Sequence, residues 1–210
     1  MKYHQIDSAL FIKNRAKFMA QMKPTSVAVF NSNDIYPVSA DSTLPFAQHR
    51  DIFYLSGVDQ EESILLLFPD APYENQREML FLKETSAHIA VWEGEKLTKD
   101  RAFEVSGIKT VYWLQDFEKI LNEMMTYSDI MYINTNEHYR ASVETETREA
   151  RFIKWWKAKY PAHQVAKSNP ILQRIRSIKE SEELDLIQNA CNITEKGFRR
   201  LLSFVKPNVM

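Results

Sequence analysis

An unbroken apolar run, Ile64-Leu65-Leu66-Leu67-Phe68, constrains the fold more than any other feature of this sequence. Successive side chains of a strand point to opposite faces of the sheet, so a strand with one wet face alternates apolar and polar residues. This run does not alternate, which requires cover on both faces of its sheet. It is therefore predicted to be an inner strand of a layered domain.

Other short apolar segments fit strands of the same sheet, and segments of helical spacing lie between them. The predicted strands cover 27–30, 52–56, 63–68, 79–82, 110–114, 130–133 and 164–166. The predicted helices cover 8–22, with Ser8 as its cap, 116–125 and 144–159. Strands that alternate with helices predict an α/β domain with a mixed β-sheet flanked by helices. The polar stretch 31–48 is long for a loop without structure, and such loops are often functional.

The chain changes character after Pro170. Ser181 is a suitable helix N-cap, and two glutamates follow it at the positive end of the predicted helix dipole. Apolar and small residues then recur at helical spacing up to Leu202, so the helix is long and amphipathic. We interpret 1–172 as an α/β accessory domain, and 173–210 as a linker and the first helix of a truncated second domain.

Composition excludes several function classes. A formal net charge of −1 offers no electrostatic reason to expect nucleic acid or an anionic membrane as a partner. Met1 to Lys17 lacks the apolar core of a signal peptide, and no uncharged apolar run is long enough to span a membrane. The single cysteine cannot form an internal disulfide. These features predict a cytoplasmic protein.

Glycine and histidine spacing argue against two common kinds of site. A loop that cradles a phosphate needs several glycines close together, but the four glycines are scattered: Gly57, Gly94, Gly107 and Gly197. Zinc ligands need close, regular spacing, which the five histidines lack: His4, His49, His88, His138 and His163. We therefore expect no nucleotide loop and no zinc site, and we interpret the histidines as surface or structural residues.

Three further features are assigned structural roles. Cys191 lies on the apolar face of the last predicted helix and is interpreted as a small buried residue. The acidic side chains at 144, 146 and 149 alternate with arginines, which is typical of a solvated helix face. The pair Trp155-Trp156 is interpreted as core and edge packing.

Three segments carry more specific information. The first runs from Ser39-Ala40-Asp41-Ser42 through Pro45-Phe46-Ala47-Gln48-His49-Arg50-Asp51 to Gly57. The second is Ile89-Ala90-Val91-Trp92-Glu93-Gly94-Glu95-Lys96-Leu97. The third is Arg174-Ile175-Arg176-Ser177-Ile178-Lys179-Glu180-Ser181-Glu182-Glu183. In this order and spacing, they resemble the N-terminal region of aminopeptidase P (Xaa-Pro aminopeptidase), of the creatinase/prolidase group of "pita-bread" metallopeptidases.

The resemblance implies a two-domain protein. The first domain is an α/β domain with a mixed sheet. The second binds two divalent metal ions, usually manganese, through two Asp, one His and two Glu, which activate water to hydrolyse the bond before proline. All five ligands are expected beyond residue 210, so this chain alone is expected to be inactive and to bind no cofactor. The expected partners are peptides with proline at the second position and further copies of the chain, as a dimer or tetramer.

The resemblance also implies two substrate-binding residues. Trp92 matches a tryptophan that walls the substrate pocket of an adjacent subunit, where a flat aromatic can stack on a proline ring. Asp41 matches an acidic residue in a loop near the same site, where a carboxylate can bind the α-amino group of the substrate. The structural alternatives are a tryptophan at a loop edge and an aspartate that caps a turn beside Ser42.

Three other functions stay open from the sequence. A prolidase, which cleaves dipeptides, differs chiefly in how its pocket is closed, and Trp92 in its matching context favours the aminopeptidase. A pita-bread protein without its metal ligands would act as a peptide- or protein-binding module. An unrelated α/β domain is the plainest alternative.

Overall fold

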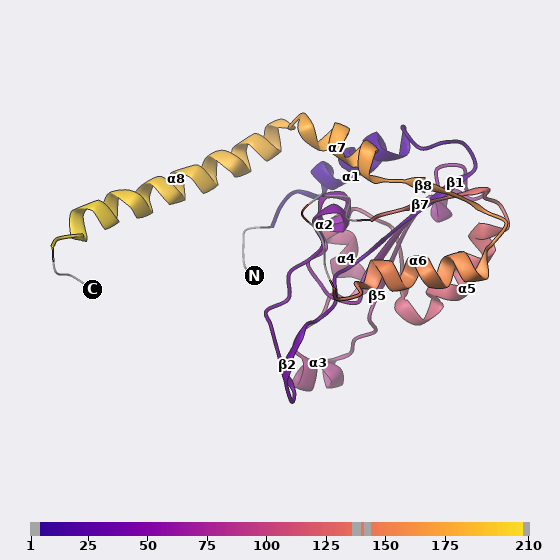
Figure 1. Ribbon diagram of the computed structural model, residues 1–210, viewed down its shortest axis with the longest axis horizontal. Coiled ribbons are helices and arrows are strands. Elements are labelled where there is room, and N and C mark those ends of the chain that lie inside the picture. Colours follow the sequence, from indigo (N-terminus) through magenta and orange to yellow (C-terminus); the bar gives the residue numbers. More distant parts are fainter. Residues whose placement is uncertain (1–4, 136–139, 141–143, 208–210) are drawn as a thin grey trace. The chain divides into compact units, whose positions relative to one another are not determined.

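A computed structural model describes residues 5–135, 140 and 144–207 of the chain. The chain forms two compact units, Met1–Ile175 and Arg176–Met210. The first unit contains the whole β-sheet and most of the helices, which Figure 1 shows along the colour gradient of the sequence.

A six-stranded mixed sheet forms the centre of the first unit, in the order β6-β5-β4-β1-β7-β8. Strand β4 runs antiparallel to both of its neighbours, whereas the other three pairings are parallel. The strand bounds are β1 Ser26–Asn31, β4 Ile64–Leu67, β5 Glu78–Leu82, β6 Thr110–Trp113, β7 Ile130–Ile133 and β8 Gln164–Lys167. The predicted mixed sheet is confirmed, and the apolar run at 64–68 is indeed buried on an inner strand.

Helices cover both faces of this sheet. Leu65 and Leu67 point into one hydrophobic cluster, which the helices α1, α2, α4 and α7 cover. Ile64 and Leu66 point into the other cluster, which α5 and α6 cover. The helix bounds are α1 Ser8–Met19, α2 Arg50–Ser56, α3 Ala87–Glu93, α4 Lys99–Ser106, α5 Phe117–Met125, α6 Arg148–Lys159, α7 Asn169–Ser177 and α8 Ser181–Phe204. The domain is therefore a helix–sheet–helix sandwich, as Figure 1 shows for α5 and α6 on their common side.

The predicted strand at 52–56 is wrong, because these residues form the helix α2. His49 caps the N-terminus of this helix through Nδ1, which accepts a hydrogen bond from the Asp51 amide at 3.3 Å. Gly57 ends it in the left-handed conformation, with φ of 70°. A Cβ atom at Gly57 would lie 2.3 Å from the Phe11 ring, so close packing also requires glycine here. The short apolar run alone does not distinguish a buried strand from a buried helical turn.

Two predicted helix caps are also displaced by one residue. Asp7, rather than Ser8, caps α1 by accepting a hydrogen bond from the Ala9 amide at 2.9 Å. Glu180, rather than Ser181, caps α8 in a capping box with Glu183. In both places the preceding carboxylate, rather than the serine hydroxyl, binds the free amides of the first turn.

The second unit consists mainly of α8. No residue of this helix is buried, and large apolar side chains along it are exposed, including Phe198 and Leu202. The interpretation of Cys191 as a buried residue is therefore wrong in this structure, where it is exposed. Among the described helices, none has the length and apolarity that crossing a membrane requires.

Candidate functional site

Asp41 lies at the tip of a small hairpin that interrupts the long polar stretch after β1. The hairpin pairs β2 (Pro37–Ser39) with β3 (Ser42–Thr43), and Ala40 turns the chain with a positive φ of 50°. All residues of the hairpin are exposed, Asp41 included. The acidic side chain therefore faces solvent, where it is available to a positively charged group.

Trp92 lies in the last turn of the short helix α3. The Ser86 hydroxyl caps this helix by accepting a hydrogen bond from the Ile89 amide at 3.3 Å. Gly94 ends it, with φ of 77° and ψ of 167°, a backbone conformation that strongly favours glycine. The glycine of the motif thus places the tryptophan at a helix end. The Trp92 side chain itself lies outside the described part of the structure.

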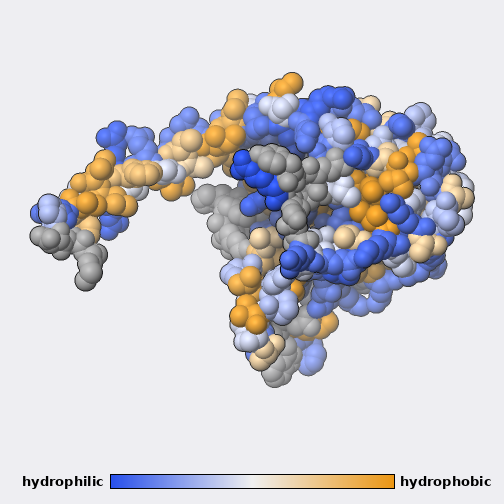
Figure 2. Space-filling view, in the orientation of Figure 1, coloured by the Kyte–Doolittle hydropathy of each residue, from blue (hydrophilic) through white to orange (hydrophobic). Residues whose placement is uncertain are grey.

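The two predicted substrate-binding residues come from separate elements. Within the described residues, no hydrogen bond or ion pair joins the β2–β3 hairpin to α3. The hairpin carries exposed apolar side chains at Tyr36, Val38 and Leu44, and Val91 of α3 is 76% exposed. Figure 2 shows hydrophobic surface at the lower projection of the first unit, where Figure 1 places β2. Solvated apolar side chains on projecting elements are typical of surfaces that contact a partner or ligand.

Three interactions tie the base of the hairpin to the domain. Asp34 binds Arg151 of α6 at 2.6 Å. The Tyr36 hydroxyl lies 3.1 Å from the Thr145 hydroxyl, and Asn33 donates to the Ala47 carbonyl at 2.9 Å. The tip bears Asp41 beyond these anchors, so the domain fixes where the hairpin emerges while its tip stays solvated.

A polar network joins the carboxyl ends of β1 and β7, at the point where the chain leaves β1 toward the β2–β3 hairpin. The Glu149 carboxylate accepts a hydrogen bond from Asn31 Nδ2 at 2.8 Å and another from the Asn134 amide at 3.3 Å. The Asn134 side chain in turn donates to Asp51 of α2 at 3.0 Å and accepts from Ser168 after β8 at 2.9 Å. The network therefore couples the start of α6 to the ends of three parallel strands.

The prediction of a solvated acidic face is wrong for Glu149. Burial raises the pKa of Glu149 to about 7, and the hydrogen bonds from Asn31 and Asn134 offset only part of this effect. Glu144 and Glu146 are exposed, as predicted, but they lie before α6, because this helix starts at Arg148 rather than at the predicted residue 144. The sequence signal for this cluster is the polar residue Asn31 at the end of the apolar strand β1, because functional groups gather at the ends of parallel strands.

Known proteins share both the sequence pattern and the fold of this domain. The family model described as the aminopeptidase P N-terminal domain matches residues 11–132, more than half of the chain. The chain belongs to this family. The matched region contains the β2–β3 hairpin, α2 and α3, and hence both predicted substrate-binding residues.

Curated relatives and solved structures agree with this assignment. The Xaa-Pro aminopeptidase of Escherichia coli is 23% identical over 98% of this chain, which spans 46% of that relative. The human Xaa-Pro aminopeptidase 3 is 24% identical over 80% of this chain and is covered to 33%. The structure of Pseudomonas aeruginosa aminopeptidase PepP matches 99% of this chain and 47% of its own, with a TM-score of 0.80 and 20% identity. The chain thus spans less than half the length of these relatives.

The histidines of this aminopeptidase P N-terminal domain have mainly structural contacts. His49 caps α2, and His163 Nε2 lies 3.0 Å from the Met125 carbonyl oxygen. His88 is exposed on α3, whereas His4 and His138 lie outside the described residues. Within the described part of the chain, no group of three or more His, Cys, Asp or Glu could hold a metal ion.

The tryptophan pair on α6 packs as predicted. Trp156 is buried in the core beside α5, and Trp155 is partly buried against the same cluster. Both indoles therefore contribute to the packing of α6 on the sheet, and neither is exposed as a binding platform.

Proposed function

We propose that this chain is the N-terminal, non-catalytic domain of a metal-dependent Xaa-Pro aminopeptidase, which hydrolyses the bond between an N-terminal residue and proline. The observation that carries the proposal is the family match over 11–132, together with curated relatives named Xaa-Pro aminopeptidase that align along 98% and 94% of the chain. The activity belongs to the whole protein.

We further propose that Trp92 helps to complete the substrate pocket of a neighbouring subunit. Its position at the end of a short helix supports this role, because a side chain there can reach beyond its own domain. A rigid indole can stack on a proline ring and exclude water while losing little conformational entropy. The homo-oligomer, a dimer or tetramer, follows from the same proposal.

Asp41 is proposed to bind the free α-amino group of the peptide. It is exposed at the hairpin tip, and the apolar side chains of Val38 and Leu44 near it could cover apolar parts of a peptide. A charge-assisted hydrogen bond to an ammonium group is about twice as strong as one between neutral groups. Such a contact explains how a peptidase can require a free N-terminus.

The two divalent metal ions, manganese by the resemblance, are proposed to bind in the region that follows this chain. The described residues offer no cluster that fits a metal ion, so none of them is assigned a role in holding one. A zinc-substituted E. coli aminopeptidase P in complex with product, at 23% identity and a TM-score of 0.76, supports a divalent metal in a protein of similar fold. The cytoplasm is the proposed location.

The gene beyond codon 210 tests this proposal directly. Two Asp, one His and two Glu in the order of the family, together with manganese-dependent release of the first residue from Xaa-Pro peptides, would support a dinuclear metallopeptidase. Replacement of several of these ligands, with no hydrolysis at any metal concentration, would reject the enzyme. The same fold would then be better explained as a peptide- or protein-binding module.

A further inference from the structure

The arm that leads from β1 to the hairpin, residues 31–36, lies along the start of α6 (Figure 1). Four residues of this arm bind the same short stretch of chain, 145–151, and we call these contacts the latch. The pairs are Asn31 with Glu149 at 2.8 Å, Ser32 with Arg148 at 2.8 Å, Asp34 with Arg151 at 2.6 Å and Tyr36 with Thr145 at 3.1 Å. Between 109 and 118 residues separate the members of each pair, so only the folded domain brings them together.

The latch lies between a fixed point on the sheet and the hairpin itself. At the sheet, the Ser32 amide donates to the Ser63 carbonyl at 2.9 Å, and the Ser63 amide donates to the Ser32 hydroxyl at 3.1 Å. At the other end, the Leu44 amide donates to the Tyr36 carbonyl at 2.9 Å and closes the hairpin. The latch joins the arm to α6 between these two points, so a shift of the first turn of α6 moves the arm and the hairpin with it.

Glu149 is the member of the latch whose charge conflicts with its position. Burial raises its pKa to about 7, whereas the hydrogen bonds from Asn31 and Asn134 and the charge of Arg148 lower it by less. An ionised Glu149 gains solvation when the first turn of α6 moves away from the sheet. The same movement withdraws Arg148 and Arg151 from the arm.

Charged side chains of both signs lie around the first turn of α6. They are Arg148 and Arg151 on the helix, Asp34 on the arm, Asp51 on α2 and Glu62 before β4. Arg148 favours the ionised form of Glu149, but the carboxylates on the arm and before β4 also act on Arg148. Asp51 carries a charge of the same sign as an ionised Glu149, and Asn134 joins the two by hydrogen bonds. The arginine therefore offsets only part of the cost of burying the Glu149 carboxylate.

We propose that the latch is a conformational switch, which fixes the hairpin when Glu149 is neutral and releases it when Glu149 is ionised. The hairpin is then held at acid pH and freed as the pH rises toward neutrality. Its effect on peptide binding rests on the proposed role of Asp41. A fixed hairpin presents the Asp41 carboxylate to the peptide in one place, whereas a released hairpin does not.

Hydrogen exchange of the 210-residue chain, resolved by NMR, tests the switch at the Leu44 amide. Its protection, corrected for intrinsic exchange, should fall by about tenfold or more between about pH 5.5 and about pH 7.5. In Glu149→Gln, which keeps the size and cannot ionise, protection should stay constant. The Gln76 amide, which donates to the Tyr73 carbonyl at 3.0 Å beyond the other end of β4, should show no pH dependence in either protein.

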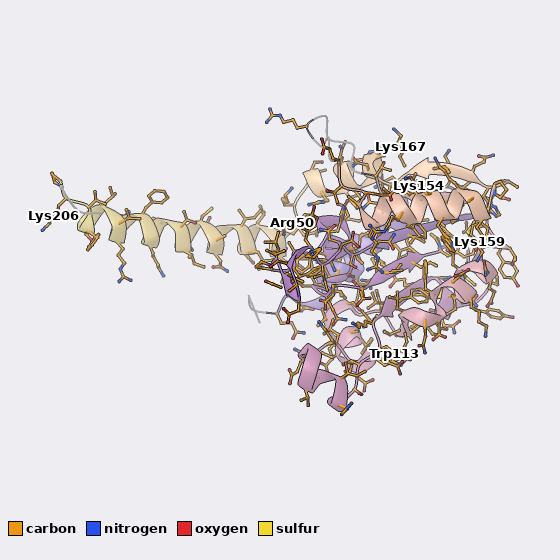
Figure 3. The ribbon with its side chains drawn as sticks, turned by 60° about the horizontal axis from the view of Figure 1, so that its bottom comes forward. Arg50, Trp113, Lys154, Lys159, Lys167 and Lys206 are labelled. Carbon is orange, nitrogen blue, oxygen red and sulfur yellow. The ribbon has the colours of Figure 1, made fainter. Side chains whose placement is uncertain are left out.

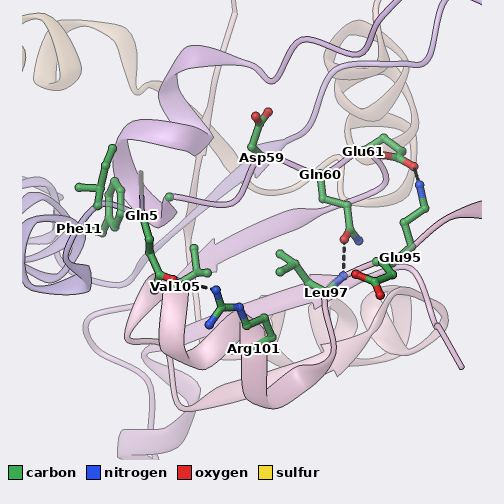
Figure 4. Close-up of a pocket in the computed structure, with 12 residues that line it drawn as sticks. Gln5, Phe11, Asp59, Gln60, Glu61, Glu95, Leu97, Arg101 and Val105 are labelled. Atoms are coloured by element: carbon green, nitrogen blue, oxygen red, sulfur yellow. Dashed lines mark hydrogen bonds and ion pairs between the residues drawn. The ribbon is translucent and has the colours of Figure 1, made fainter. Parts of the chain in front are cut away.

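Two further variants keep the test decisive. Glu95→Gln is the matched control, because Glu95 is exposed at a separate pocket (Figure 4), and it should retain the fall of the parent chain. Asp34→Asn removes the ion pair with Arg151, so protection of Leu44 should be lower at every pH, even if Glu149→Gln fails to fold. Constant protection of Leu44 in the parent, or an equal fall in Glu149→Gln, would overturn the switch. Parent-like protection in Asp34→Asn would overturn the latch.

Kinetics of the full-length protein separate this switch from the proposed function. KM for Xaa-Pro peptides should rise with pH more steeply in the parent than in Glu149→Gln, with kcat affected alike in both. If exchange shows the switch but the two KM profiles are parallel, the switch stands and the role of Asp41 in peptide binding fails. If exchange shows no switch, the proposal fails whatever the kinetics.

Discussion

β1 and β4 bury every one of their residues, whereas every residue of the β2–β3 hairpin is exposed, although all four strands belong to the same compact unit. The inner strands find their partners within the domain, in two hydrophobic clusters on opposite faces of the sheet. The apolar side chains of the hairpin, such as Val38, contact solvent, whereas those of the inner strands contact helices. The comparison teaches that contacts within the domain explain the core strands, whereas they do not explain the exposed apolar side chains of the hairpin and of Val91 on α3.

Arg15 tests the core side of this comparison with the largest expected effect. It is fully buried on α1, where its Nε binds Glu78 at 2.9 Å and its Nη1 donates to the Leu55 and Ser106 carbonyls at 2.8 and 2.9 Å. Arg15→Met leaves these acceptors unpaired, so the free energy of unfolding should fall by about 3–5 kcal/mol in urea titrations.

Lys154→Met is the matched control for the buried arginine. Lys154 lies on α6 (Figure 3), and its ion pair with Glu146 is exposed to solvent. This pair should contribute about 0–1 kcal/mol. Equal losses of stability in the two variants would break the comparison between core and surface.

Glu149 tests the network that links the core to the base of the hairpin. Its pKa of about 7 in the folded chain lies above the ordinary value of 4.5, so the folded state holds a proton that the unfolded state releases between these values. The contribution of Glu149 to the free energy of unfolding is therefore complete below pH 4.5 and is lost as the pH rises through about 7. In Glu149→Gln, the loss of unfolding free energy over this window should shrink by about 1–3 kcal/mol.

Glu146→Gln is the control for this pH dependence, because Glu146 is exposed. Its stability should follow the parent curve across the same pH window, within about 0.5 kcal/mol. An unchanged slope in Glu149→Gln would show that the carboxyl group of Glu149 titrates as if it were in water.

Trp92 tests the exposed side of the comparison. In the full-length protein, Trp92→Ala should lower kcat/KM for Xaa-Pro peptides by about 10- to 100-fold, because a stacked aromatic wall is lost. The free energy of unfolding should change by no more than about 1 kcal/mol. Tyr73→Ala, which removes an exposed aromatic side chain outside α3 and the hairpin, should leave both quantities unchanged. Unchanged kcat/KM across several peptide lengths would remove Trp92 from the site.

Asp41 should show the smallest effect. Asp41→Asn should raise KM by up to about tenfold, since it weakens one solvated charge contact, with kcat affected less. Ser39→Ala on the same hairpin provides the control. A fall in kcat with constant KM would assign Asp41 a role other than binding of the α-amino group.

The core of the fold is predictable from the sequence, because burial leaves a regular pattern. The apolar run at 64–68 and the segment at 130–133 both indicate strands, since their side chains on both faces meet helices. The segment at 52–56 has the same apolar character but is a helix, which depends on the His49 cap and on Gly57 rather than on periodicity. Helix α4 has no clear periodic pattern either, although Thr98 caps it and Gly107 ends it.

The candidate site is only partly predictable. Motif order points to Asp41 and Trp92 as candidates, and the structure places Asp41 on an exposed hairpin and Trp92 at the end of α3. The Glu149 carboxylate accepts hydrogen bonds from Asn31 and Asn134, which lie 118 and 15 residues away along the chain. Such sites depend on long-range contacts, which residue spacing does not encode.

Complementation between one impaired and one inactive full-length protein tests the central proposal most directly. One partner carries Trp92→Ala, and the other keeps Trp92 but lacks one metal ligand of the catalytic region. Co-expression forms mixed oligomers, in which the second protein offers its intact tryptophan to the metal site of the first. We predict that hydrolysis of Xaa-Pro peptides rises clearly above that of either variant alone. Activity no higher than that of the Trp92→Ala protein, in oligomers shown to contain both chains, would contradict a pocket completed by a neighbouring subunit.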